Sequence, residues 1–263
     1  MIPLEERTMN GFWRDTWLTF ERHMRLSLRN PVWVILGLIQ PLLYLTLFGP
    51  LLKPVVANTP GLPPGDEWQV FVPGLLVQLG MFGAAFVGFG LVAEYRAGVI
   101  ERQRVSPASR VALLAGRVLR DVVVILVQTV LLLLAAVPFG LRAPIGGVLL
   151  SLVVVAGLGA SFASLSYGCA LLLRSEDALA PLFNGLAMPL LLLSGILLPM
   201  SLAPAWLRHL SDANPLKHVV DGTRSFFAGD LSSSAALWGS VSTVALVAVS
   251  LWFGARTFRR ESA

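Results

Sequence analysis

Charged side chains are scarce in this sequence. Of its 263 residues only 13% are charged and 56% are hydrophobic, whereas a soluble domain carries about 25% charged residues. The few charges are also unevenly distributed, because long uncharged stretches alternate with short clusters of Arg, Asp and Glu. A charge near the centre of a bilayer costs about 3 kcal/mol even on lenient insertion scales. This distribution is therefore typical of an integral membrane protein.

Lysine, cysteine and histidine are nearly absent, and this excludes several chemistries. Neither Lys53 nor Lys217 follows a glycine, so the chain lacks the Gly-Lys-Ser/Thr of an ATP-binding P-loop. Cys169 is the single cysteine and the three histidines are scattered, so neither an intramolecular disulfide nor a metal site is expected. We expect no catalytic residue and no cofactor on this chain.

Acidic residues are missing from the interiors of the long apolar stretches. Glu94, Asp121, Glu176 and Asp177 all fall at the margins of those stretches. A carrier coupled to protons or sodium usually needs carboxylates at membrane depth. The sequence therefore disfavours an ion-coupled carrier.

The uncharged stretches are long enough to cross a membrane six times, since about 20 helical residues cover the apolar core. The sequence predicts an all-α integral membrane protein with one transmembrane domain over residues 1–263. The expected spans are residues 31–52, 69–93, 118–139, 147–173, 178–198 and 235–257.

Basic residues predict the orientation. Fifteen of the 20 Lys and Arg residues fall on the side that carries both termini and the second connection. Both termini are therefore expected in the cytoplasm. The net charge of +5 does not indicate a nucleic-acid partner, because the sequence contains no long basic run.

Residues 9–30 predict an amphipathic helix at the membrane surface. Trp13, Trp17 and Phe20 recur on one helical face, and arginines occupy the rest. Tryptophan on one face and arginine on the other is typical of an interfacial helix. An ordinary soluble helix packed on a partner is the alternative.

Residues 94–110 form the densest charge cluster and a candidate site for contact with a partner. Gly98 divides the segment, and Ser106-Pro107 predicts a new helix start that leads into the third span. Composition alone fits a solvated turn equally well.

Residues 199–230 form the last outer connection and are not purely polar. The pattern predicts two short amphipathic helices separated at Asn214-Pro215. We expect them to form a re-entrant hairpin that dips back into the outer leaflet. A simple surface cap is the alternative.

Small and uncharged polar residues within the spans indicate either helix packing or a substrate path. Gly80, Ala84 and Gly88 recur every four residues, which favours close helix approach. The stripe also suits a seam between two copies, and a path there would be lined by the first, second and fifth spans. The candidate residues of this path are Gln40, Gln78, Gly80, Asn184, Ser194 and Gly195.

The order of these features resembles the permease subunits of ABC type-2 transporters, in particular the daunorubicin-resistance and nodulation-factor export branch. The resemblance rests on the interfacial helix, Gln40-Pro41, the 94–107 pattern, Ser194-Gly195 and Asn214-Pro215 with Arg224. It covers nearly the whole chain.

This resemblance implies a bacterial inner-membrane exporter of two permease copies, expected to be a homodimer. Each copy would dock on a separate cytoplasmic ATP-binding subunit that holds the ATP and Mg. Residues 94–110 would then be the coupling helix, with Glu94, Arg96, Gly98, Glu101, Arg102, Ser106 and Pro107 as its site residues.

The charge-free spans suit a hydrophobic or amphipathic cargo, such as a drug or antibiotic. Export of a glycolipid or lipid-linked saccharide is the alternative within the same class. An ion-coupled secondary carrier and a non-transporting membrane scaffold are the remote alternatives from other classes.

Overall fold

The computed structural model describes residues 4–51, 67–98, 109–197 and 200–260. Within those ranges every regular element is a helix. Six helical stretches are long and apolar enough to cross a membrane, namely Val34–Leu51, Glu67–Arg96, Arg110–Phe139, Ile145–Leu173, Glu176–Ser194 and Ser234–Arg260. The expected all-α fold with six apolar spans is confirmed.

The spans are built from seven helices and two short helical turns. The first comprises α2 (Val32–Leu43) and the π-helical turn η1 (Tyr44–Phe48), and the second comprises α4 (Glu67–Ala85) and α5 (Gly88–Arg96). The others are α7 (Arg110–Ala136) with the 3-10 turn η2 (Val137–Phe139), α8 (Ile145–Leu173), α9 (Glu176–Ser194) and α12 (Ser234–Arg260). Outside the spans lie α1 (Leu4–Arg29), the 3-10 turn η3 (Met200–Leu202), α10 (Ala205–Asp212) and α11 (Pro215–Phe227).

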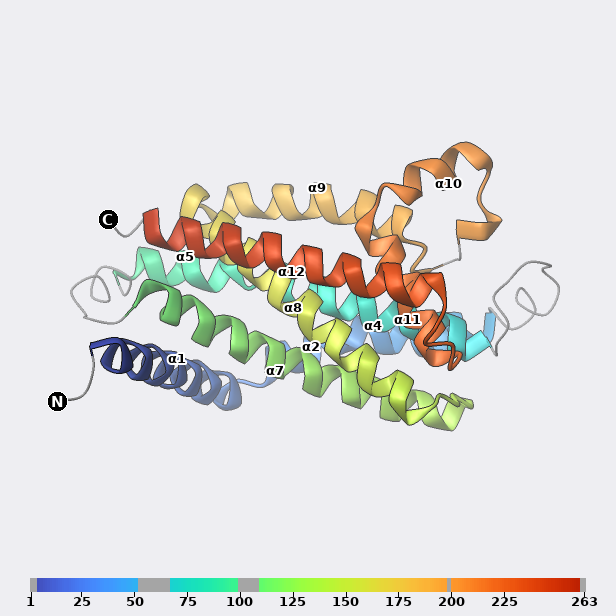
Figure 1. The fold of residues 1–263 in the computed structure, drawn as a ribbon, viewed down its shortest axis with the longest axis horizontal. Helices are drawn as coiled ribbons and strands as arrows, with labels where there is room; N and C mark the ends of the chain where they lie inside the picture. Colours follow the sequence, from blue (N-terminus) through green and yellow to red (C-terminus); the bar gives the residue numbers. More distant parts are fainter. Residues whose placement is uncertain (1–3, 52–66, 99–108, 198–199, 261–263) are drawn as a thin grey trace.

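The spans run roughly side by side, and both termini lie at the same end of the bundle (Figure 1). We call this the Glu94 end, because it also carries the end of α5 and the beginning of α7. The opposite end, which we call the Arg224 end, carries α10, α11, the beginning of α4 and the end of α9.

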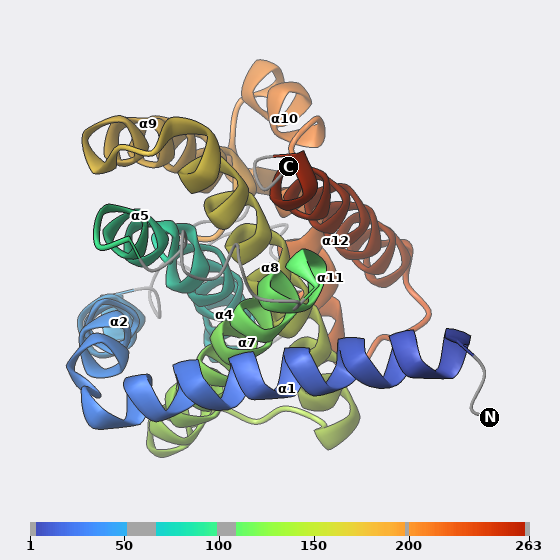
Figure 2. The ribbon, with the colours of Figure 1, turned by 90° about the vertical axis from the view of Figure 1, so that its left-hand side faces the viewer.

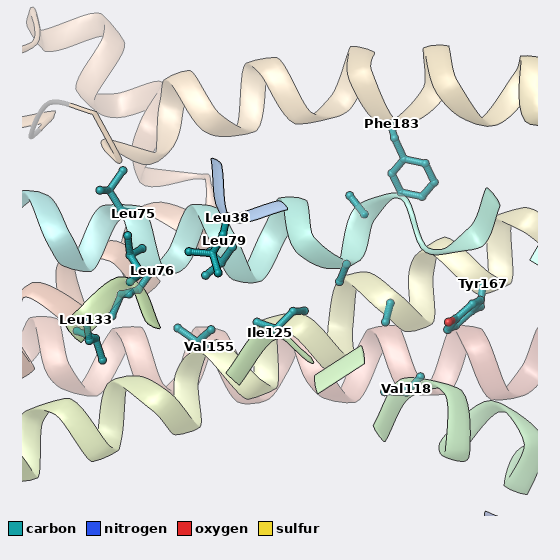
Figure 3. Close-up of a cluster of buried hydrophobic side chains, with 14 of the residues drawn as sticks. Leu38, Leu75, Leu76, Leu79, Val118, Ile125, Leu133, Val155, Tyr167 and Phe183 are labelled. Carbon is teal, nitrogen blue, oxygen red and sulfur yellow. The ribbon is translucent and has the colours of Figure 1, made fainter. Parts of the chain in front are cut away.

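Helix α8 is the central element and packs through small residues. A Cβ on Gly80 of α4 would lie 3.2 Å from Leu158 Cβ, and one on Gly157 would lie 3.0 Å from a methyl of Thr243 in α12. Buried leucines, valines and isoleucines fill the space that remains between α4, α7 and α8 (Figure 3). Close approach gains dispersion contacts, which drive helix association in lipid.

Helix α1 lies across the Glu94 end rather than along the spans (Figure 2). Its buried face carries Thr16, Thr19 and His23, and it approaches α7 so closely that a Cβ on Gly116 would lie 2.6 Å from Thr16 O. The tryptophan face points away, with Trp13 65% exposed. An apolar face left uncovered by the described chain suits the membrane surface that the sequence predicts for this helix.

Three span boundaries differ from the sequence expectation. Helix α7 begins at Arg110 after the N-cap residue Ser109, eight residues before the expected boundary, because Arg117 and Asp121 find partners inside the bundle. The expected start at Ser106-Pro107 lies outside the described residues. The second span is broken between α4 and α5, and α9 ends at Ser194 with Gly195 in the left-handed conformation.

The connection after α9 contains the two short helices that the sequence predicts, α10 and α11. Pro215 occupies the first turn of α11, and Asn214 caps that helix by accepting a hydrogen bond from Leu216 N at 3.0 Å. A side-chain cap and a proline in the first turn together stabilise a helix start. The Asn214-Pro215 boundary is therefore confirmed, and insertion into the outer leaflet stays a prediction.

Candidate functional site

The Glu94 end is held by polar and charged side chains from three helices. Arg117 Nη2 of α7 lies 2.6 Å from Glu94 Oε2 of α5, and the Arg117 side chain is 4% exposed. His23 Nδ1 of α1 lies 4.0 Å from Glu94 Oε1. Since a buried charge needs a partner, Glu94 ties the end of the second span to the beginning of the third.

His23 contributes to this junction as a neutral imidazole. Burial, assisted by the nearby Arg117 cation, lowers the pKa of His23 from 6.5 to about 4. Glu94 opposes this shift without reversing it. The contact between His23 and Glu94 is therefore not an ion pair at neutral pH.

A second polar contact joins α7 to α8 just deeper in the bundle. Tyr167 Oη donates a hydrogen bond to Asp121 Oδ2 at 2.6 Å, and Arg120 Nη1 lies 2.9 Å from Asp121 Oδ1. Figure 3 shows Tyr167 on α8 near α7. A buried carboxylate with two partners fixes the relative position of the helices that supply them.

The structure describes three of the seven predicted coupling residues. Glu94 and Arg96 end α5, and Arg96 Nη1 lies 3.6 Å from Glu176 Oε1 of α9. Gly98 has a φ of 68°, a conformation that favours glycine, so the chain turns away from the helix there. The other four predicted residues, Glu101, Arg102, Ser106 and Pro107, lie outside the described residues.

Four phenylalanines cluster around the break in the second span. The ring of Phe86 lies 6.5 Å from that of Phe82, 5.9 Å from that of Phe89 and 6.2 Å from that of Phe183 of α9. Figure 3 shows Phe183 pointing from α9 toward the second span. Sequence reasoning missed this cluster, although the spacing of residues 82, 86 and 89 places them on one helical face.

Two of the predicted path residues lie on the surface of helices that flank α5. Gln40 of α2 and Asn184 of α9 are both exposed. Figure 2 shows α2 and α9 flanking α5. Gln40 Nε2 donates to Tyr44 Oη at 3.5 Å on the same face of the first span, and the amides of Gln40 and Asn184 can both face a second copy, lipid or cargo.

The other predicted path residues of the second span are inside the chain. Gln78 is buried, and its Oε1 has no hydrogen-bond partner among the described residues. Gly80 packs on Leu158 and Val155, and a Cβ on Gly88 would lie 2.5 Å from Ser166 O. The small-residue stripe therefore packs on α8, as the helix-packing interpretation predicts, and the path role of Gln78 and Gly80 stays a prediction. The four-residue spacing of small residues predicts close packing but does not identify the helix against which they pack.

Ser194 and Gly195 form the end of α9 rather than an open surface. Ser194 Oγ donates to Leu191 O at 2.7 Å and accepts from Ile196 N at 3.3 Å. The Gly195 carbonyl in turn accepts a hydrogen bond from Arg224 Nη2 at 2.7 Å. Both residues therefore shape the connection from the fifth span into the α10–α11 hairpin.

Arg224 is the central contact of the Arg224 end. Its Nε donates to Val70 O at 2.9 Å, and its Nη1 lies 3.7 Å from Asp221 Oδ1. Burial lowers the pKa of Arg224 to about 10, so the guanidinium stays charged at neutral pH. The guanidinium thus fastens α11 to both the second and the fifth spans.

Six apolar helical stretches around a shared core define a multi-pass membrane protein. The family model described as ABC-2 type transporter matches residues 14–228, and the chain belongs to this family. Proteins of this family are the membrane permeases of ABC transporters and work with a cytoplasmic ATP-binding subunit. The family resemblance noted in the sequence is confirmed.

Several curated relatives are membrane permeases. A Cyanophora paradoxa protein named "Putative transport permease ycf38" is 29% identical over 76% of this chain and 69% of its own. The daunorubicin resistance ABC transporter permease protein DrrB1 of Streptomyces coeruleorubidus is 27% identical over 89% of this chain and 82% of its own. The Escherichia coli K12 protein named "Probable multidrug ABC transporter permease YbhR" is 26% identical over 66% of this chain, which spans 47% of that relative.

Proposed function

We propose that this chain is the membrane-spanning subunit of an ATP-driven exporter of hydrophobic or amphipathic molecules. Two permease copies would work with two copies of a separate ATP-binding subunit, which holds the ATP and Mg. The name of one relative contains daunorubicin resistance and that of another contains multidrug transporter, and both support this cargo class. The spans themselves support it as well, because their charged side chains lie toward the ends of the bundle and an uncharged middle favours apolar cargo.

The observation that carries the proposal is the Glu94–Arg117 contact of 2.6 Å. Glu94 stands where the 94–110 segment leaves the bundle, and Arg117 is buried in α7. A displacement of the segment by an ATP-binding subunit would therefore move α5 and α7 together. We assign Glu94, Arg96, Gly98, Glu101, Arg102, Ser106 and Pro107 to this coupling role.

The proposed substrate path follows the side of the bundle where α2, the second span and α9 are neighbours. Gln40 and Asn184 supply exposed amides there, and the phenylalanine cluster supplies aromatic surface. Aromatic rings bind flat apolar molecules by offset stacking or edge contacts. Ser194 and Gly195 would shape the far end of the path, toward the α10–α11 hairpin.

This function requires the Glu94 end to face the cytoplasm of a bacterial cell. Both termini lie at that end (Figure 1). Fifteen of the 20 basic residues fall on the same side in the sequence, and the positive-inside rule assigns that side to the cytoplasm.

The test uses the chain co-expressed with an ATP-binding cassette subunit in membrane vesicles. We expect the permease to stimulate ATP hydrolysis, and Glu101→Ala to reduce both that stimulation and daunorubicin transport at least tenfold. Asp177→Ala is the matched control, since it removes one exposed carboxylate from the first turn of α9 at the same end. Full transport by the Glu101→Ala variant would contradict the proposal.

A further inference from the structure

The second span is interrupted about two thirds of the way along it, without a proline. No proline occurs between Pro73 and Pro107, yet α4 stops at Ala85 and α5 begins at Gly88. Around the break the backbone forms tighter bonds three residues apart, such as Phe89 N to Phe86 O at 3.2 Å. A break of this kind frees backbone groups from the α-helical pattern, and an unsatisfied group costs several kcal/mol in a membrane interior.

Ser166 of α8 satisfies one donor and one acceptor at this break. Its hydroxyl donates to Ala85 O at 2.7 Å and accepts from Gly88 N at 2.9 Å, and both contacts are buried. Gly88 permits the approach because any Cβ there would lie 2.5 Å from Ser166 O. One side chain of α8 thus bridges the two halves of the second span.

This use of a serine differs from every other serine of α8. Ser151, Ser161 and Ser164 each donate back to the carbonyl four residues earlier in α8 itself. That local bond is the ordinary solution for a serine inside an apolar helix. Only Ser166 directs its hydroxyl to another helix, and it does so where that helix is broken.

The break connects the two parts of the proposed machinery. On its far side α5 carries Glu94 and Arg96 into the coupling segment. At the break itself Phe86 contacts Phe89 on one side and Phe183 of α9 on the other. A rotation of α5 about residues 85–88 would therefore move the Phe86 ring relative to Phe183.

We propose that Ser166 is a positioning residue that holds a hinge in the second span, so that α5 acts as a lever between the coupling segment and the phenylalanine cluster. The lever role rests on the proposed function. The hinge contact does not, because it is a property of the chain alone. Ser166 touches neither cargo nor nucleotide in this scheme and acts through the position of Phe86.

The first measurement is hydrogen exchange of the purified full-length chain in detergent. Ser166→Ala should raise the exchange rate of the amides at residues 87–90 at least tenfold, while Ser164→Ala should leave it within twofold. Gly88→Ala should also raise exchange at residues 87–90, because its Cβ would lie 2.5 Å from Ser166 O and 2.8 Å from Ser166 Oγ and so forces the break away from α8. Ser166→Thr, which keeps the hydroxyl, should restore protection.

The second measurement is the ATPase activity of the chain reconstituted with an ATP-binding subunit, with daunorubicin as the probe. Ser166→Ala should keep the basal ATPase rate within twofold of the unaltered chain. It should reduce the stimulation of that rate by daunorubicin at least fivefold. Ser164→Ala should retain the stimulation.

The outcomes separate the hinge, the lever and the proposed function. Unchanged exchange at residues 87–90, or faster exchange along all of α8, would overturn the hinge. Faster exchange at the break with full daunorubicin stimulation would overturn the lever. If the unaltered chain fails to stimulate any ATP-binding subunit, the proposed function and the lever fail, and the exchange data still decide the hinge.

Discussion

Each end of the bundle buries an arginine, and the two guanidinium groups have different kinds of partner. At the Glu94 end, Arg117 pairs with the carboxylate of another helix. At the Arg224 end, the arginine donates to the main-chain carbonyls of Val70 and Gly195, with Asp221 farther away at 3.7 Å. One end thus relies on contacts between side chains and the other on contacts between a side chain and the backbone.

This difference suits different mechanical tasks. A side-chain pair can separate and re-form as rotamers change, whereas a carbonyl just beyond the end of a helix moves only with the helix. The α10–α11 hairpin is fastened to α9 in this second way twice, since Asn214 Nδ2 also donates to Leu190 O at 2.9 Å. The Arg224 end therefore behaves as one unit, and the Glu94 end is the place where α5 and α7 can shift together against the rest of the bundle.

The largest expected effect is at Arg224. Arg224→Leu leaves two buried carbonyls without their charged donor, which we expect to cost about 3 kcal/mol of unfolding free energy. For a chain of this size the Tm should fall by about 10 °C, measured by thermal unfolding in detergent. Arg208→Leu, which removes an exposed arginine from the same hairpin, is the control. Equal Tm values for the two variants would show that the buried contacts of Arg224 do not stabilise this end of the bundle.

A smaller effect, and one that a second substitution can reverse, is expected at the Glu94 end. Arg117→Met should cost about 2 kcal/mol, because it leaves Glu94 without its partner while water still reaches part of the carboxylate. Adding Glu94→Gln should recover about 1 kcal/mol, since both charges are then gone. The double-mutant cycle is measured by thermal unfolding. Strictly additive losses would show that the two side chains are not coupled.

The smallest effect concerns His23 and pH. Its folded pKa of about 4 lies below the ordinary 6.5, so protonation favours release of the imidazole from its buried site. The stabilisation is fully present above pH 6.5 and is lost as the pH falls toward 4, with about 1 kcal/mol lost at pH 5.5. Thermal unfolding at pH 7.5 and 5.5 measures this loss. His23→Gln should remove the part of the pH dependence that belongs to His23, and an identical loss in that variant would refute the assignment.

Much of the fold follows from local sequence. Charge depletion and span length predict six apolar helices, because these depend on the cost of burying charge and on the thickness of a bilayer. Asn214-Pro215 predicts the division of the hairpin, because a cap and a proline act on their own helix. The amphipathic pattern of Trp13 and Trp17 likewise predicts an α1 with one apolar face.

The candidate site depended on contacts between distant parts of the chain. The bond from Ser166 to Ala85 joins residues 81 positions apart, and the bond from Arg224 to Val70 joins residues 154 apart. No local pattern shows that Gly80 packs on α8, that the second span breaks at Phe86 or that Arg117 pairs with Glu94. The sequence by itself determined which segments are apolar, helical and capped. Only the tertiary structure decided which buried polar groups meet, because each satisfies its hydrogen bonds with whatever partner the packing brings within reach.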